Sequence, residues 1–153
     1  MSYFISKHVY LRKGYYSSLI MVVSVFFGSS SLIAGASASH YLGDFLDARD
    51  LEIFETAVRF QMYHSIILLI IGSLHTIGRK INILKLGLLE VAATFVGIGI
   101  IMFSGSLYIL AITDSVNWIG PLTPLGGVLL IIGWFCLALA AFNSYSKIEL
   151  AGT

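Results

Sequence analysis

The stretch Thr56–His75, TAVRFQMYHSIILLIIGSLH, decides the fold of this chain. After His64 it is built almost entirely from isoleucine and leucine, as expected of a helix surrounded by lipid. Before that run, Arg59, Gln61 and His64 stand within the same segment. Polar groups at membrane depth are costly in free energy and mark functional positions by default. The stretch therefore predicts a membrane-spanning helix with a polar half.

The composition of the whole chain agrees with an integral membrane protein of one domain, residues 1–153. Hydrophobic residues make up 58% of the chain and charged residues 11%, whereas a soluble domain carries about 25% charged residues. The net charge of +1 gives no reason to expect a nucleic-acid partner. The single cysteine, Cys136, excludes a disulfide within one chain. The lipid bilayer is thus the expected environment.

Four apolar segments are each long enough to cross a bilayer, which takes roughly 20 residues of helix. They cover about residues 15–38, 57–77, 86–112 and 123–142, with a polar outer connection at 39–55. Short connections make neighbouring helices antiparallel. The sequence predicts an all-α, integral membrane four-helix bundle.

A secretory signal peptide is the alternative interpretation of the first segment. A basic start precedes the segment, and Ala36-Ser37-Ala38 resembles a cleavage site. The apolar region, however, exceeds the ~7–15 residues of a signal peptide. A membrane span is therefore the better interpretation.

Asp50 is expected to cap the helix that follows the polar connection.

Lysine and arginine predict the orientation of the bundle. The first connection contains only Arg49, whereas the second contains Arg79, Lys80 and Lys85. The segment before the first span is also basic, and the third connection has no lysine or arginine. Because basic residues are enriched in cytoplasmic loops, both termini are expected to be cytoplasmic.

With this orientation, polar residues gather in the outer half of the bundle, where we expect a ligand site or a structural polar cluster. Its members are His40, Gln61, His64, Ser104, Ser106, Tyr108 and Thr123. Two further polar residues, His75 and Glu90, lie toward the inner end.

His64 and Glu90 each allow two interpretations. A neutral His64 can form a hydrogen bond to Gln61, Ser104 or Tyr108 that only joins helices, or it can relay protons or bind a ligand. Its neighbours have no spacing typical of a metal site. For Glu90, the expected partners come from the basic second connection: Arg79, Lys80 and Lys85. A proton or cation site is the alternative for Glu90.

Small residues follow helical spacing in two of the segments. Ser24, Gly28, Ser31 and Gly35 share one face of the first, and Gly126, Gly133 and Ala140 share one face of the fourth. Such faces allow membrane helices to approach closely. No catalytic constellation, cofactor motif or metal signature is present in the sequence, so no cofactor is expected and an enzyme is not favoured.

Several motifs resemble one known family in order and spacing. Thr56–His64 is similar to T-A-x-x-Y-Q-x-x-H, Phe103–Tyr108 to F-S-G-S-L-Y, Thr123–Gly127 to T-P-x-G-G, and Gly133-Trp134 to its G-W element. These motifs resemble the domain of unknown function 423 family, which includes transmembrane protein 256. The resemblance covers about residues 33–142.

The chain departs from this family in one place. Where the family has G-A-F-G-A-H, Gly35–His40 keeps the glycine, alanine and histidine but loses the phenylalanine and second glycine. The resemblance implies a small multi-helix protein of the bacterial inner membrane, or of the mitochondrial inner membrane as the alternative. It implies no established activity.

The sequence is compatible with three functions. The first is a structural or accessory protein that packs with itself or with a larger membrane complex, supported by the small-residue faces. The second is a transporter or conductor of protons or small solutes, which would need His64, Thr94 and Glu90 to face one cavity. The third is a membrane-embedded enzyme acting on a lipid or quinone.

Overall fold

The computed structural model of the chain describes residues 2–81, 86–113 and 119–151, and its side chains between residues 15 and 143 within those ranges. These residues form long α-helices and one short 3-10 helix, with no strand among them. In chain order the elements are α1 (Ser2–His40), η1 (Leu42–Asp44), α2 (Ala48–Ile81), α3 (Leu86–Ile112) and α5 (Leu122–Ala151).

Each long helix contains a segment that is long and apolar enough to cross a membrane. These segments are Tyr15–His40, Ala48–Ile81, Leu86–Ile112 and Leu122–Asn143. The predicted all-α membrane fold is therefore confirmed. The side of the membrane that each end faces stays a prediction.

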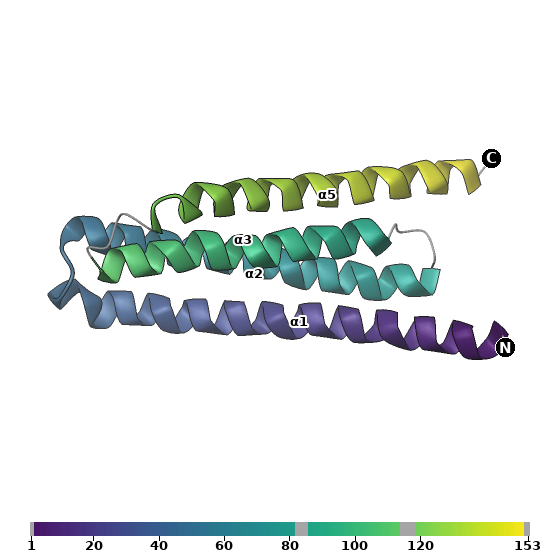
Figure 1. Cartoon of the computed structure of the whole chain (residues 1–153), viewed down its shortest axis with the longest axis horizontal. Coiled ribbons are helices and arrows are strands. Elements are labelled where there is room, and N and C mark those ends of the chain that lie inside the picture. Colours follow the sequence, from purple (N-terminus) through teal and green to yellow (C-terminus); the bar gives the residue numbers. More distant parts are fainter. Residues whose placement is uncertain (1, 82–85, 114–118, 152–153) are drawn as a thin grey trace.

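Successive helices run in opposite directions, so α1 begins and α5 ends at the same end of the bundle (Figure 1). We call this the terminal end, and the opposite end, which carries η1, the turn end. Helix α1 packs on α2, α2 on α3, and α3 on α5. Figure 1 shows α1 and α5 on opposite sides of the α2–α3 pair. The outer helices consequently present broad apolar surfaces, such as those around Phe26 and Phe135.

The predicted cap of α2 was wrong by one turn. Helix α2 begins at Ala48, and the backbone N–H of Asp50 donates to the Asp47 carboxylate at 2.8 Å. Asp47 therefore caps the helix, because its side chain accepts an N–H that the first turn leaves without a partner. Asp50 lies inside the first turn.

The small residues of α1 and α5 pack inside the chain. A Cβ added at Gly28 would lie 3.3 Å from Ser65 Oγ, and one at Gly35 would lie 3.3 Å from Val58. On α5, a Cβ at Gly126 would lie 2.8 Å from the Cα of Phe103. These contacts hold α1 against α2 and α5 against α3.

Candidate functional site

His64 is held by two hydrogen bonds. Its Nδ1 lies 2.8 Å from the carbonyl oxygen of Phe60, one turn earlier on α2. The indole N–H of Trp134 on α5 donates to its Nε2 at 3.3 Å. Because a carbonyl accepts and an indole donates, these contacts require the neutral tautomer with the proton on Nδ1. The prediction that Gln61, Ser104 or Tyr108 would be the hydrogen-bond partner of His64 was therefore wrong.

Gln61 uses its amide nitrogen to join α2 to α1. Its Nε2 donates to the carbonyl oxygen of Phe27 at 2.9 Å and to Ser30 Oγ at 2.7 Å. Both amide hydrogens are thus used, and the amide oxygen remains an acceptor.

Ser106 and Thr123 form a separate bridge between α3 and α5. Their hydroxyl oxygens lie 2.7 Å apart, and Ser106 also donates to the carbonyl oxygen of Phe103 at 2.8 Å. Thr123 therefore donates to Ser106, since Ser106 has only one hydroxyl hydrogen. This pair is a helix contact within the bundle.

Ser104 and Tyr108 have buried hydroxyl oxygens without a hydrogen-bond partner among the described residues. The Tyr108 ring packs on Phe54, with ring centroids 4.8 Å apart. A buried hydroxyl without a partner is unfavourable, because it has lost water and gained no replacement. These two oxygens are therefore places where a ligand atom could complete the hydrogen bonding.

His40 does not join the other members of the predicted cluster. It is the last residue of α1 and is exposed at the turn end. It lines a pocket on the α1–α2 face, together with Arg59 and Tyr63. The structure thus divides the predicted cluster into several separate sites.

The terminal half of the bundle contains a second polar group. Nε2 of the fully buried His75 lies 3.0 Å from a carboxylate oxygen of Glu90, across the α2–α3 interface. The Tyr16 hydroxyl on α1 lies 3.3 Å from the carbonyl oxygen of Glu90 and 3.2 Å from Thr94 Oγ1. The sequence interpretation missed Tyr16, although its position near the start of the first span suits an aromatic residue with a polar tip.

Basic residues of the second connection were the expected partners of Glu90, and this expectation was wrong for those described. Glu90 pairs with His75, while Arg79 donates to Ser17 Oγ at 3.5 Å. Lys85 lies outside the described residues. His75 lies 15 residues before Glu90, so only the antiparallel packing of α2 and α3 brings the two side chains together.

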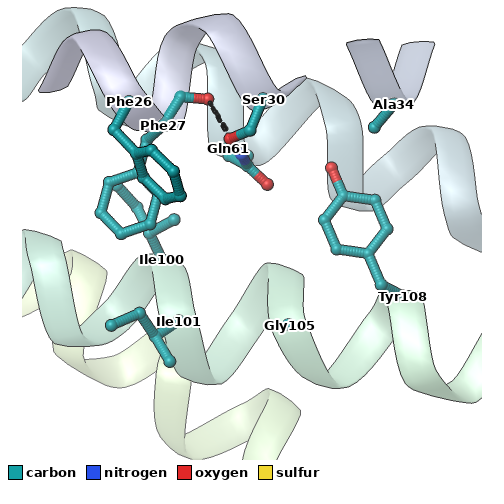
Figure 2. A pocket seen from close by; sticks show the side chains of 9 residues that line it. All are labelled: Phe26, Phe27, Ser30, Ala34, Gln61, Ile100, Ile101, Gly105 and Tyr108. Atoms are coloured by element: carbon teal, nitrogen blue, oxygen red, sulfur yellow. Dashed lines mark hydrogen bonds between the residues drawn. The ribbon is translucent and has the colours of Figure 1, made fainter. Parts of the chain in front are cut away.

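A pocket of about 330 Å³ opens between α1 and α3, with α2 as its floor. We call it the α1–α3 pocket. Figure 2 shows Phe26, Phe27 and Ile101 toward one end, and Tyr108 at the other. The amide of Gln61 faces the space beside the Tyr108 ring (Figure 2). The pocket therefore has an apolar half toward the middle of the helices and a polar half toward the turn end.

Comparison with known proteins gives the family. Residues 34–127 match the family described as "Protein of unknown function (DUF423)". The chain belongs to the DUF423 family. The resemblance seen in the sequence motifs is thereby confirmed. The match contains Gln61, His64 and Tyr108, whereas Tyr16 and Trp134 lie outside it.

Relatives of this DUF423 chain occur in several bacteria. It is 43% identical to UPF0382 membrane protein SSP2132 of Staphylococcus saprophyticus, over 71% of this chain and 84% of the relative. It is 36% identical to UPF0382 membrane protein YwdK of Bacillus subtilis, over 70% and 82% of the two chains. A UPF0382 membrane protein of Haemophilus influenzae is 38% identical over 73% and 84%. No solved structure matches the chain.

These names establish a membrane protein and no activity. DUF423 and UPF0382 both denote families of unknown function, and the relatives are named membrane proteins of bacteria. Within the described part of the chain, no three histidine, cysteine, aspartate or glutamate residues gather closely enough to hold a metal ion.

Proposed function

We propose that this DUF423 protein binds an uncharged amphiphile of the bilayer in the α1–α3 pocket. The amphiphile places an alcohol or ester head near Tyr108 and its hydrocarbon chain between Phe26 and Ile101. The observation that supports this proposal most directly is at Tyr108, which lines the pocket and whose hydroxyl is buried without a hydrogen-bond partner among the described residues.

The position of Tyr108 along α3 supports this orientation. Helix α3 has 27 residues and is thus roughly 40 Å long, whereas the hydrocarbon core of a bilayer is about 30 Å thick. Tyr108 lies one turn before the end of α3 at Ile112, so it is close to a membrane interface. Ile101 lies about 10 Å deeper along the helix axis. The polarity of the pocket therefore runs in the same direction as that of a lipid.

The polar groups of the pocket define the chemistry of the head. Tyr108 can donate a hydrogen bond, and the amide oxygen of Gln61 can accept one, since its nitrogen is used by α1. None of the described residues that line the pocket is charged. A hydroxyl or ester head matches these groups, whereas a charged head would lose its hydration without a counter-ion. The volume lies within the range of small-molecule pockets, about 300–1,000 Å³.

Retention of monoolein tests the proposal, because this lipid carries hydroxyls and an ester carbonyl on one chain. The full-length protein in a mild detergent should retain monoolein in native mass spectrometry and should not retain squalene, which has no polar head. Tyr108→Phe should weaken retention about fivefold, the effect of one hydrogen bond. Equal retention by wild type and Tyr108→Phe, together with equal retention of squalene, would refute a head-specific site.

Two glycines of α3 provide a matched pair for the same experiment. A Cβ added at Gly105 or at Gly97 would meet no atom within 4 Å, but only Gly105 lines the pocket. Gly105→Leu should therefore fill the pocket and abolish retention, while Gly97→Leu should leave it unchanged. Loss of retention in both variants would show that the pocket is not the site.

An accessory role stays a prediction after the structure is known. The small-residue faces that suggested it pack inside the chain, as the contacts of Gly28 and Gly126 show. They are therefore not free to receive a partner helix. What could still receive one is the apolar outer surface of α1 or α5, which lipid would cover equally well.

Conduction of protons or solutes also stays a prediction, with less support from the geometry. Glu90 and Thr94 line one pocket of about 470 Å³ in the terminal half, and His64 is not among its lining residues. His64 already uses both ring nitrogens, on Phe60 and Trp134. A relay through His64 would have to break one of these two hydrogen bonds.

A further inference from the structure

A second pocket lies on the α1–α2 face at the turn end. It contains Arg59, a charged residue that plays no part in the proposed function. It has a volume of about 350 Å³, and the described residues that line it differ from those of the α1–α3 pocket. His40 comes from the end of α1, and Arg59 and Tyr63 come from α2. Leu32 and Met62 form part of its apolar wall. We call it the His40–Arg59 pocket.

Arg59 keeps hydrogen-bonding capacity inside this pocket. Its guanidinium contacts the Glu55 carboxylate at 3.4 Å and donates to Thr56 Oγ1 at 2.9 Å. A guanidinium has five N–H donors, so these contacts leave donors for a further acceptor. Its side chain is about half exposed, at 48%. The planar fork of arginine suits a phosphate group, which can accept two parallel hydrogen bonds.

The depth of Arg59 places it at the level of lipid head groups. Val58 packs against Gly35 of α1, five residues before the end of that helix at His40. At 1.5 Å per residue, the side chain of Arg59 therefore leaves α2 about 8 Å below the end of α1. An arginine at this depth extends toward the interface, where phosphates are the available anions. Leu32 and Met62 are placed to contact the lipid chain.

We propose that the His40–Arg59 pocket binds the head group of a phospholipid, with Arg59 on the phosphodiester. Glu55 lies one turn nearer the turn end than Arg59, about 6 Å along the axis of α2. A carboxylate just outside a phosphate site suits an ammonium group. The pocket therefore matches a zwitterionic ethanolamine head better than a glycerol head, and His40 adds a donor or acceptor beside the phosphate.

The charge of the connection at the same end of the bundle supports the same choice. The connection at the turn end carries Asp44, Asp47 and Asp50 but only one basic residue, Arg49. Acidic residues at this end of the bundle favour an ammonium group over additional anionic charge. A head group that brings both a phosphate and an ammonium group is thus favoured over one that brings the phosphate alone.

Competition between defined lipids tests the proposal in the full-length protein. Nanodiscs with equal amounts of dioleoyl-phosphatidylethanolamine and dioleoyl-phosphatidylglycerol are dissolved in mild detergent, and lipids retained by the protein are counted by native mass spectrometry. Wild type should retain phosphatidylethanolamine in excess. Dioleoylglycerol lacks the phosphate, and it is tested in Gly105→Leu, whose α1–α3 pocket is filled. This variant should retain it at least tenfold less than phosphatidylethanolamine, and equal retention would overturn the proposal.

Substitutions separate the two charged contacts. Arg59→Gln should reduce retention of both phospholipids about tenfold, while Glu55→Gln should remove only the preference for ethanolamine. Arg49→Gln is the matched control, because Arg49 does not line the pocket, and it should change nothing. If Arg59→Gln lowers the yield of folded protein, Arg59→Lys keeps the charge and should still weaken retention, because the two-pronged contact is lost. Unchanged retention in Arg59→Gln or Arg59→Lys would overturn the proposal.

Two further measurements show whether the ligand is a lipid or free phosphate, and whether it binds here or in the α1–α3 pocket. Inorganic phosphate at millimolar concentration should not displace the lipid, and displacement would overturn the lipid assignment in favour of free phosphate. Tyr108→Phe should leave phospholipid retention unchanged, so the two pockets can fail or succeed independently.

Discussion

Trp134 on α5 donates its indole N–H to Nε2 of His64 on α2, across a distance of 3.3 Å. This contact joins two helices that are not neighbours in the chain. Together with the Phe60 carbonyl on Nδ1, it gives a neutral histidine both of the partners that it needs within the membrane. Both ring nitrogens of His64, the most conspicuous polar residue of Thr56–His75, are therefore hydrogen-bonded within the bundle.

Removing the indole donor should destabilise the bundle modestly. Trp134→Phe leaves Nε2 of His64 without a partner, and we expect a loss of about 1 kcal/mol in the free energy of unfolding. The measurement is the SDS concentration at which helicity is lost when SDS is added to protein in mild detergent. Phe135→Leu, at a neighbouring lipid-facing position, should have a smaller effect. A double-mutant cycle with His64→Leu should give a coupling of the same size, and zero coupling would contradict the contact.

The sequence left open whether His64 joins helices by a hydrogen bond or relays protons or binds a ligand, and the partners that it suggested were wrong. Periodicity places residues on a face of one helix, and a histidine can also bond to the carbonyl one turn before it. Which other helix supplies the second partner depends on the crossing of α2 and α5. Trp134 was identified from a motif, and nothing in the motif indicates that its indole reaches His64.

The pair His75–Glu90 should be more costly to break than to replace. Glu90→Leu leaves the fully buried His75 without its carboxylate partner, and we expect a loss of about 2 kcal/mol in the free energy of unfolding. The double variant His75→Leu/Glu90→Leu should be less destabilised than Glu90→Leu alone, because no polar group is left unpaired. Unfolding in SDS measures both. A double variant as unstable as the sum of the two single variants would contradict this account.

The fold class followed from the sequence because membrane spans are local features. Length and hydropathy suffice to identify the segment that became α3, Leu86–Ile112, since lipid requires every backbone polar group to be bonded within the helix. The pairing of side chains is not local. Glu90 was assigned to the nearby basic residues, whereas the antiparallel packing of α2 and α3 placed it against His75. Likewise Asp47 caps α2, whereas the sequence suggested Asp50, because several acidic residues in that stretch are able to serve as the cap.

The approach of α5 to α3 at Gly126 should be intolerant of a single methyl group. A Cβ on Gly126 would lie 2.8 Å from the Cα of Phe103, and backbone cannot move aside as a flexible side chain can. Gly126→Ala should therefore cost about 1–3 kcal/mol in the free energy of unfolding, even though alanine favours the helix. Gly97→Ala adds the same methyl group in open space on α3 and should be neutral or slightly stabilising. Equal stability of the two variants in SDS unfolding would show that α3 and α5 do not approach this closely.

The basic residues predict that both termini face the cytoplasm, and reporter fusions can test this orientation. The two ends of the bundle are distinct, because α1 begins and α5 ends on the side on which α2 also ends, and Arg79 and Lys80 lie in the last turn of α2 (Figure 1). Alkaline phosphatase should therefore be inactive when fused to the C-terminus, and green fluorescent protein should be fluorescent there. Phosphatase inserted after Gly43 in η1, where a Cβ would meet no atom within 4 Å, should be active. An active C-terminal phosphatase would reverse the orientation and place the His40–Arg59 pocket in the cytoplasmic leaflet.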